Sequence, residues 1–477
     1  MARRFPVLGK TLALGSVLLV LVIALQCVSA IVAERQGRLR EAEASVAASL
    51  AAAQTVVGPV LTRSCTESWD AVQGEGKDRK TVIAHRDFQI SAAPAALDIQ
   101  AEATIEPRYR GIFEVNGYVL KARLAATWND GLALQPPAGR DGSRVRCAAP
   151  VMFVALGDSR GVRSASAQLD GSARAVLPGT LHASHPRGFH VDVPEAFAGS
   201  GRPLAAQVVL ELAGTGDLAF APVGDSSRVA LASDWPHPSF AGRFLPIERQ
   251  VGSAGFTARW QLNALATTAP RLVVEGGTAC GLFEGRGDPT ASPGEPAAGR
   301  EEAKPLRCVE TFGVAFMDPV SPYVLSDRAT KYGLLFIALT FVGVGAVEVL
   351  RRLRVHPIQY LLVGAALAMF FLLLVSLSEH IAFVWAYLAA AAACTALLTF
   401  YGSFVLRSLR AGAVFGAGIA ALYGVLYALL QLEQNALLLG TLLLFAVLTA
   451  MMVATRRIDW YALFDRMRSE GPSRGSP

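Results

Sequence analysis

The sequence predicts an α-helical membrane protein with six spans and a large all-β, sandwich-like domain inserted between the first and second spans. Residues 332–455 contain five long apolar runs in quick succession, and a sixth run lies near the N-terminus. The intervening stretch, 34–331, consists mostly of short apolar runs separated by turn residues. With 52% hydrophobic and 17% charged residues and a mean hydropathy of +0.39, the chain is too apolar for a soluble enzyme and too polar for helices alone.

The first expected span covers residues 11–33, after a short cytoplasmic segment at 1–10 that contains Arg3, Arg4 and Lys10. The run exceeds the h-region of about 7–15 residues in a secretory signal. Although Val28-Ser29-Ala30 resembles a cleavage site, we expect an uncleaved anchor. Residues 34–57 are rich in Ala, Glu and Arg and contain no Pro, which predicts a helical stalk that stops at Gly58-Pro59.

The β-rich domain is expected over residues 60–325. Its predicted strands are the alternating or β-branched runs at 113–128, 151–156, 173–177, 189–193, 205–212, 229–232 and 256–262. Two stretches, 135–144 and 285–305, are crowded with Gly, Pro, Ala and charges and are expected to be protruding loops. Asn116-Gly117 is compatible either with a hairpin turn or with a bulge in one strand.

The five later spans are expected at 332–350, 358–377, 381–406, 413–430 and 436–455, each long enough for a hydrocarbon core of about 30 Å. Basic residues gather on one side of these spans: Arg351, Arg352, Arg354, Arg407, Arg410, Arg456, Arg457, Arg466 and Arg468. The opposite loops, 378–380 and 431–435, contain no Lys or Arg. The positive-inside rule therefore predicts cytoplasmic termini, a cytoplasmic tail at 456–477 and, in a Gram-negative cell, a periplasmic segment at 34–331.

The net charge of +6 does not indicate a nucleic-acid partner. The basic residues lie mainly at membrane edges and form no patch with interleaved aromatic residues. We therefore expect the lipid bilayer as a partner and no nucleic acid. The sequence is silent on protein partners in the envelope and on oligomeric state.

The six cysteines divide by compartment. Cys27 and Cys394 lie in expected spans, whereas Cys65, Cys147, Cys280 and Cys308 would face an oxidising compartment in which disulfides persist. Cys280 and Cys308 bracket the loop insertion at 281–307 and form a candidate disulfide. Four cysteines allow three connectivities, and the sequence does not choose among them.

No motif predicts an enzyme, a cofactor or a metal. The sequence has no nucleophile elbow, zinc-protease motif, phosphate loop or dinucleotide fingerprint. His182, His185, His190 and Asp192 could collect a metal, but Pro186 and Gly188 favour a plain exposed loop. Residues 157–161 are interpreted as a turn between strands.

Three ionisable residues form a candidate functional edge at the outer ends of the spans: Glu379, His380 and Glu433. A carboxylate–imidazole cluster there could bind a cation or relay protons. The alternative is that they are wetted loop residues that keep two hairpins in register. Glu348 is expected to face Arg351 and Arg352. Because no span has a charge at its centre, a proton-coupled transporter is weakly supported.

Several stretches resemble the CreD family of inner-membrane proteins, also called cell-envelope integrity proteins. In the spans they are HPIQYLLVG (356–364), SLSEH (376–380), and Arg328 with KYGLLF (331–336); in the outer domain, WPHPSF (235–240), FLP (244–246), GFTARW (255–260) and FGV (312–314); at the end, TRRIDWY (455–461). The resemblance implies an inner-membrane protein that contributes to envelope integrity and whose production is tied, in the family, to a two-component envelope-stress and nutrient regulon. It implies no catalytic activity.

The resemblance also favours one continuous strand with a bulge at Asn116-Gly117. The segment Thr62-Arg63-Ser64-Cys65 and the 281–307 insertion depart from the family pattern, so no disulfide follows from the resemblance. The aromatic residues Trp235, Phe240, Phe244, Phe256 and Trp260 are expected to form core or to seat the domain on the membrane. We expect a structural or regulatory role; the alternatives are a transporter or channel component and a periplasmic ligand sensor.

Overall fold

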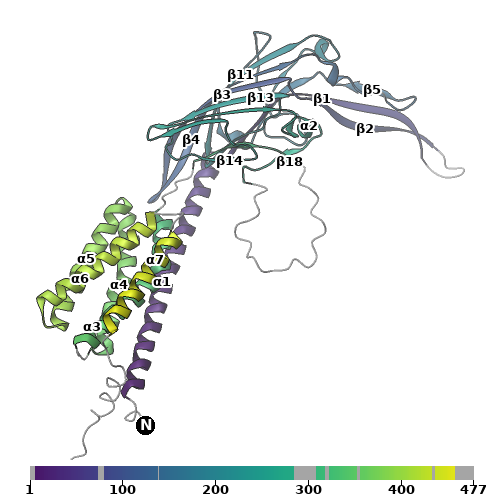
Figure 1. Ribbon diagram of the computed structural model, residues 1–477. Helices are drawn as coiled ribbons and strands as arrows, with labels where there is room; N and C mark the ends of the chain where they lie inside the picture. The colour runs from purple at the N-terminus through teal and green to yellow at the C-terminus, as the bar shows by residue number, and fades with distance from the viewer. Residues whose placement is uncertain are drawn as a thin grey trace, which may run out of the picture. The chain divides into compact units, whose positions relative to one another are not determined.

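The computed structural model describes residues 6–73, 80–137, 139–283, 308–316, 322–351, 355–431 and 436–456. The chain divides into two compact units (Figure 1). One unit is helical and comprises Met1–Arg40 and Val320–Pro477, and the other is built on β-sheets and comprises Glu41–Pro319.

The helical unit contains the N-terminal part of α1 (Pro6–Ser49) together with α3 (Pro322–Arg351), α4 (Pro357–Ser378), α5 (Phe383–Val405), α6 (Leu409–Gln431) and α7 (Ala436–Thr455). Five helices among the described residues, α1 and α3 to α6, are long and apolar enough to cross a membrane. The apolar part of α7, Leu438–Val453, is shorter. The membrane-protein fold class is confirmed with five such helices, and the sixth span stays a prediction.

Helix α4 shows how the sequence sets its own start. The His356 side chain accepts a hydrogen bond from the Ile358 N–H at 3.3 Å, and the Gln359 side chain accepts one from the His356 N–H at 3.0 Å. Pro357 occupies the first turn, where its missing N–H costs nothing. The HPIQ segment that carries the family resemblance is therefore a helix N-cap.

Close packing of the helices depends on small residues. A Cβ atom at Gly412 of α6 would lie 2.6 Å from the Cα of Ser403 in α5. Such a distance is too short for any side chain, so glycine is what lets these two backbones approach. Large apolar residues of α1, α3 and α4 fill the rest of this core; they include Leu21, Phe336, Phe370, Phe371 and Leu374.

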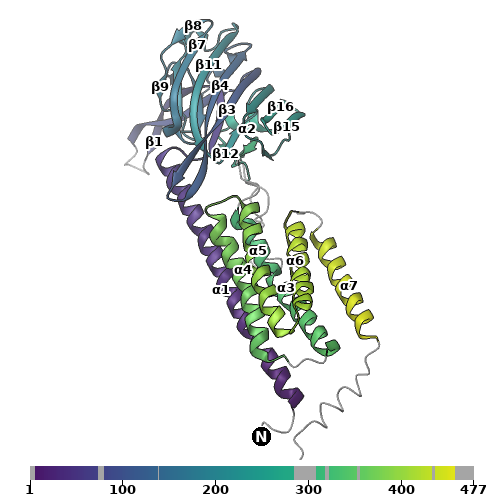
Figure 2. The same cartoon turned by 90° about the vertical axis from the view of Figure 1, so that its left-hand side faces the viewer.

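The β unit consists of two large sheets that share one hydrophobic core (Figure 2). The first sheet has the order β14-β19-β12-β1-β6-β10-β9, with β2 and β5 also paired to β1. Its strands are β1 (Gln54–Gln73), β2 (Lys80–Ala92), β5 (Arg144–Cys147), β6 (Val151–Leu156), β9 (Leu177–Pro178), β10 (Gly188–Asp192), β12 (Asp217–Phe220), β14 (Ser239–Gly242) and β19 (Phe312–Ala315).

The second sheet has the order β15-β16-β13-β3-β4-β11-β7-β8. Its strands are β3 (Ala96–Arg110), β4 (Phe113–Trp128), β7 (Val162–Leu169), β8 (Ser172–Arg174), β11 (Leu204–Thr215), β13 (Ser226–Ser233), β15 (Glu248–Gly252) and β16 (Gly255–Asn263). The short helix α2 (Ala269–Val274) and the two-stranded pair β17 (Thr278–Ala279) and β18 (Cys308–Val309) complete the described unit. The expected all-β domain is confirmed.

Period-two alternation places one face of each central strand in the core. In β4, Leu120, Ala122, Leu124 and Ala126 are buried while the residues between them are exposed. Phe153 of β6 contributes to the same core from the other sheet. The aromatic residues flagged in the sequence also belong to this core: Phe256 and Trp260 are buried, and Trp235, Phe240 and Phe244 pack against it.

Two expected element boundaries need correction. Helix α1 ends at Ser49 rather than at Gly58-Pro59, and that dipeptide lies inside β1. The strand tolerates it because the pairing of β1 with β6 shifts register between Val57 and Val60. The expected strand at 173–177 is split between β8 and β9.

The single-strand interpretation of Asn116-Gly117 agrees with the structure, but the expected bulge is absent. Asn116 pairs with Pro107 and Gly117 with Glu106 in unbroken register along β3 and β4. The chain turns instead at Gly111-Ile112, where Gly111 adopts a positive φ of 61°.

Two disulfides staple the β unit. Cys65 of β1 and Cys147 of β5 are direct partners in the sheet register and are joined to each other. Cys280 is joined to Cys308, so the second disulfide closes the insertion predicted at 281–307, of which 284–307 lie outside the described residues. Of the three connectivities open to the sequence, the structure has this one.

Candidate functional site

Glu379, the first of the three candidate edge residues, directly follows α4. Its Oε1 atom lies 3.3 Å from Nε of Arg35 in α1. The Glu379 side chain is only 10% exposed, whereas that of Arg35 is 38% exposed. The Tyr323 hydroxyl at the start of α3 also hydrogen-bonds to Glu379, and Gln36 donates to the Tyr323 carbonyl at 3.3 Å. We call Arg35, Gln36, Tyr323 and Glu379 the α1/α3/α4 junction.

The tight turn after α4 positions this carboxylate. The backbone N–H groups of His380 and Ile381 both donate to the Leu377 carbonyl, at 3.0 and 3.1 Å. These bonds satisfy the end of the helix and bring the chain round to α5, which begins at Phe383. Glu379 is thus held at the end of the bundle by backbone geometry.

The three candidate residues have different environments. Glu379 is paired with Arg35, His380 is exposed, and Glu433 lies outside the described residues. Because a guanidinium neutralises the Glu379 carboxylate, that group does not offer a free negative charge to a cation. What the described junction does is tie three helices together; a cation or proton site at this edge stays a prediction.

Sequence reasoning did not select Arg35 or Tyr323 as members of this cluster. One signal was present: Arg35 follows the first span on the side that the positive-inside rule assigns to the exterior. A basic residue at that position is a candidate for pairing with an acidic residue at the end of another span. The partner could not be chosen from sequence, since 344 positions separate Arg35 and Glu379, the difference between their residue numbers.

Glu348 forms a second carboxylate contact within the helical unit. Its side chain accepts hydrogen bonds from the Tyr360 hydroxyl at 2.9 Å and from the Val355 N–H at 3.1 Å. These bonds join the end of α3 to the start of α4 beside a cavity of about 40 Å³. The expected neighbours Arg351 and Arg352 have side chains outside the described residues.

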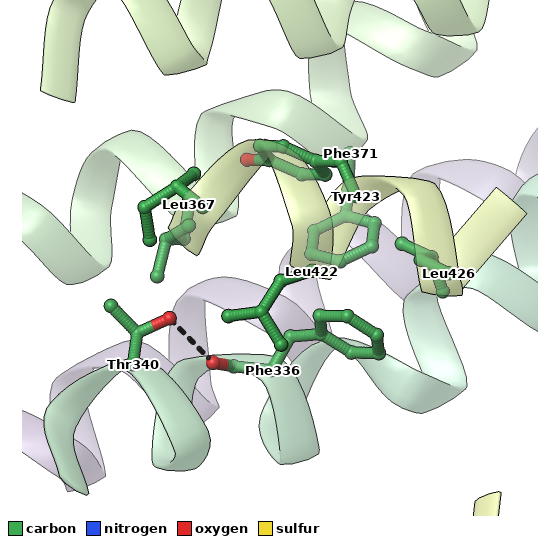
Figure 3. A pocket seen from close by; sticks show the side chains of 8 residues that line it. Phe336, Thr340, Leu367, Phe371, Leu422, Tyr423 and Leu426 are labelled. Carbon is green, nitrogen blue, oxygen red and sulfur yellow. Dashed lines mark hydrogen bonds between the residues drawn. The ribbon is translucent and has the colours of Figure 1, made fainter. Parts of the chain in front are cut away.

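A smaller cavity lies in the middle of the helices, as Figure 3 shows. Its volume is about 10 Å³, and it is lined by Phe336, Thr340, Leu367, Phe371, Ile419, Leu422, Tyr423 and Leu426. The hydrogen bond drawn there lies within α3, where the Thr340 hydroxyl donates to the Phe336 carbonyl at 2.8 Å. A space of this size holds about one water molecule. This cavity is too small for a substrate.

In the β unit, residues 157–161 form the expected turn, and it has a structural role. Arg160 donates to the Ala48 carbonyl at 2.6 Å and to Asp158 Oδ2 at 2.6 Å. Asp158 in turn accepts from the Ala52 N–H at 3.1 Å. The hydrogen bond from Arg160 is the main cause that lowers the pKa of Asp158 to about 2. The pair satisfies the C-terminal end of α1 and fixes it to the sheet.

The histidines differ from the exposed loop that the sequence predicted. His182, His185 and His190 are all buried, and only Asp192 of the four candidate ligands is exposed. His190 Nδ1 lies 2.6 Å from the Gly179 carbonyl oxygen and is engaged there. No group of three or more His, Cys, Asp or Glu side chains within the described residues is arranged to hold a metal.

The chain matches a known protein family over most of its length. A family profile described as "Inner membrane protein CreD" matches residues 6–461. The chain is 34% identical over 468 residues to "Inner membrane protein CreD" of Escherichia coli strain K12, and the match covers 96% of this chain and 94% of that protein.

Matches to solved structures are weak. A putative nutrient binding protein from Legionella pneumophila matches with a TM-score of 0.24 and 5% identity, covering 36% of this chain and 66% of that one. An M1 zinc metallopeptidase from Deinococcus radiodurans matches with a TM-score of 0.20 and 13% identity, covering 35% and 38%. Scores this low carry no inference.

The full-length match and the resemblance in the helix-capping HPIQ segment agree on one assignment. The chain belongs to the CreD family of inner-membrane proteins.

Proposed function

We propose that this inner-membrane protein contributes to cell-envelope integrity without catalysing a reaction, and that its β unit is the working part. In this proposal residues 34–331 lie in the periplasm, both termini are cytoplasmic and the spans serve as the anchor. The observation that carries the proposal is the pair of disulfides, Cys65–Cys147 and Cys280–Cys308, in the β unit. Disulfides persist in the bacterial periplasm and are rare in the cytosol.

Three features of the helical unit support an anchoring role over transport. Helices α4 and α5 contain no Asp, Glu, Lys or Arg, whereas transport pathways usually place ionisable groups within spans. Glu379 is neutralised by Arg35, and the two cavities described above have volumes of about 10 and 40 Å³. These features favour a filled, static bundle.

A complementation experiment tests this proposal. In a strain that lacks the gene, envelope integrity is measured as uptake of an impermeant dye and survival in detergent. We expect the wild-type chain to restore both, a chain lacking residues 41–319 to restore neither, and the Glu379→Gln/His380→Gln variant to behave as wild type. Immunoblots of membrane fractions must show equal amounts of each chain.

Two outcomes would contradict the proposal. Restoration by the chain that lacks residues 41–319 would show that the β unit is dispensable. A Glu379→Gln/His380→Gln variant that reaches wild-type membrane levels, keeps its thermal stability and yet fails to complement would favour the transport alternative.

A further inference from the structure

Two histidines are buried side by side in the segment between β9 and β10. His182 is 4% exposed and His185 is 7% exposed. The two imidazole ring centroids lie 5.4 Å apart. The Phe153 ring of β6 lies 5.1 Å from the His182 ring and 6.2 Å from the His185 ring, measured between centroids. Two imidazoles and one aromatic ring therefore form a compact cluster at the edge of the hydrophobic core.

The segment that carries the pair is held in place from several sides. The Thr180 hydroxyl donates to the His185 carbonyl and accepts from the His182 N–H at 3.2 Å. Gln89 of β2 also bonds this segment, donating to the Leu181 carbonyl at 2.7 Å and accepting from the Ala183 N–H at 3.0 Å. The two rings are thus presented by an ordered backbone.

Each ring of this pair has one buried nitrogen without a hydrogen-bond partner. The His185 ring is hydrogen-bonded to the backbone of Gly277, while its Nε2 atom is buried without a hydrogen-bond partner. His182 Nδ1 is likewise buried without one. A neutral imidazole that donates from Nδ1 has a lone pair on Nε2, which can bind a metal. In metal-binding histidines the other ring nitrogen almost always donates a hydrogen bond that holds the ring in place. Leaving such atoms buried and unpaired costs free energy.

The spacing of the rings suits a shared metal ion. A metal about 2.0–2.1 Å from an imidazole nitrogen lies about 3.2 Å from the ring centroid, so two imidazoles at the 120° angle of a three-coordinate ion have centroids about 5.5 Å apart. The observed separation is 5.4 Å. By contrast, His190 uses its Nδ1 on the Gly179 carbonyl and offers a natural comparison residue.

The charge of the surroundings selects the kind of ion. Within the described residues, no carboxylate or thiolate joins the two imidazoles in a ligand group of three or more. Two neutral ligands do not offset a buried double charge, which is far more costly to desolvate than a single one. Imidazole is a good copper ligand, and the nearby Phe153 ring can stabilise a cation through its π face.

We propose that His182 and His185 form a binding site for a soft univalent metal ion of the Cu⁺ class, seated against Phe153. A closed-shell univalent ion of this class is commonly three-coordinate, so the two imidazoles and one small exogenous ligand complete its coordination. The site is independent of the proposed envelope role.

Silver binding tests this proposal. Ag⁺ has the same charge and closed shell as Cu⁺ and needs no reductant, so both disulfides stay intact. The full-length chain, with Cys27 and Cys394 replaced by serine to remove free thiols, is purified in detergent and titrated with Ag⁺ in chloride-free buffer. We expect one tightly bound Ag⁺ per chain. His182→Gln and His185→Gln should each weaken this binding by roughly 10–100-fold or more, and His190→Gln should leave it unchanged.

X-ray absorption at the silver edge of the protein with native His182 and His185 gives a readout that does not depend on how the variants fold. We expect nitrogen and no sulfur in the first shell. The proposal is overturned if no Ag⁺ binds at micromolar concentration, if the first shell contains sulfur, or if His182→Gln and His185→Gln bind as tightly as the control. Tighter binding of Zn²⁺ than of Ag⁺ at the same histidines would overturn the choice of a univalent ion.

Discussion

Arg35 and Glu379 carry opposite charges in very different surroundings. The carboxylate is 10% exposed and has lost most of its water, while the guanidinium is 38% exposed and keeps much of its hydration. For such pairs, removing one partner costs more than the pair contributes, because a desolvated charge is left without compensation. The ion pair is therefore needed chiefly because Glu379 is buried.

This asymmetry leads to a testable ranking of variants. Arg35→Met should destabilise the chain by about 1–3 kcal/mol, less than the roughly 3–5 kcal/mol of a fully buried pair because Arg35 is partly solvated. Adding Glu379→Gln to Arg35→Met should recover most of the loss. Thermal unfolding of the purified chain in detergent measures both, with the exposed His380→Gln as the control. A double variant no more stable than Arg35→Met would refute the asymmetry.

At the scale of the element, the last carbonyl groups of helix α1 accept hydrogen bonds from a side chain of the distant turn at 157–161. Arg160 donates to the carbonyls of Ala47 and Ala48, and Gln54 bridges the Asp158 and Ala213 carbonyls at 2.9 Å each. A cation at a helix C-terminus also interacts favourably with the helix dipole. This long-range cap satisfies the end of α1 at Ser49, nine residues before the Gly58 at which sequence alone predicted the stop.

The Asp158–Arg160 pair should make stability depend on acid pH. Because the pKa of Asp158 is lowered to about 2 in the folded chain and is about 3.9 when unfolded, its contribution is fully present above about pH 4 and is lost as the pH falls towards 2. We expect a loss of about 1–2 kcal/mol, reduced by the exposure of Arg160. Arg160 is the largest cause of the lowered pKa, so Arg160→Met should remove most of the effect.

The measurement is the difference in thermal midpoint between wild type and Asp158→Asn from pH 5 to pH 2.5. Other carboxylates, including Glu67 and Glu106, also have lowered pKa values and contribute to the wild-type curve. The comparison with Asp158→Asn isolates one group, and Asp192→Asn provides an exposed control. Parallel curves for wild type and Asp158→Asn would rule out the assigned role.

Elements determined by neighbouring residues in the sequence could be predicted from it. Elements determined by contacts with residues remote in the sequence could not. Strand β4 was predicted with its observed bounds, Phe113–Trp128, because apolar and polar residues alternate along consecutive positions. Gly58-Pro59 has the composition of a helix stop, yet sheet pairing absorbs it within β1. Pro186 and Gly188 suggested an exposed loop, but Phe153 and Gln89, both remote in sequence, hold that segment and help to bury its histidines.

In the candidate site, too, the features set by neighbouring residues were predictable and the contacts between remote residues were not. The position of Glu379 at a span end was evident from the length of the apolar run, and the turn after α4 agrees with it. Its pairing with Arg35 depends on how α1 packs beside α4, which hydrophobic length does not specify. His380 was grouped with Glu379 because the two are adjacent in sequence, although only Glu379 is largely buried.

At the scale of the whole molecule, the number of spans decides on which side of the membrane the chain ends. Five helices satisfy the length and composition of a span, and the described apolar part of α7 is shorter. With a cytoplasmic N-terminus, five spans would leave the C-terminus in the periplasm, and six would return it to the cytoplasm. The basic residues Arg456, Arg457, Arg466 and Arg468 favour the second arrangement.

Fusions to a phosphatase that is active only in the periplasm resolve this question. A fusion within 285–305 should be active and one after Arg410 inactive, because these points lie on opposite sides of the proposed membrane arrangement. A fusion at the C-terminus should be inactive, since five arginines follow α7 and retain the tail in the cytoplasm. An active C-terminal fusion with the other two as expected would show that α7 does not cross. Reversal of the first two would overturn the orientation itself, and with it the periplasmic environment that the disulfides of the β unit require.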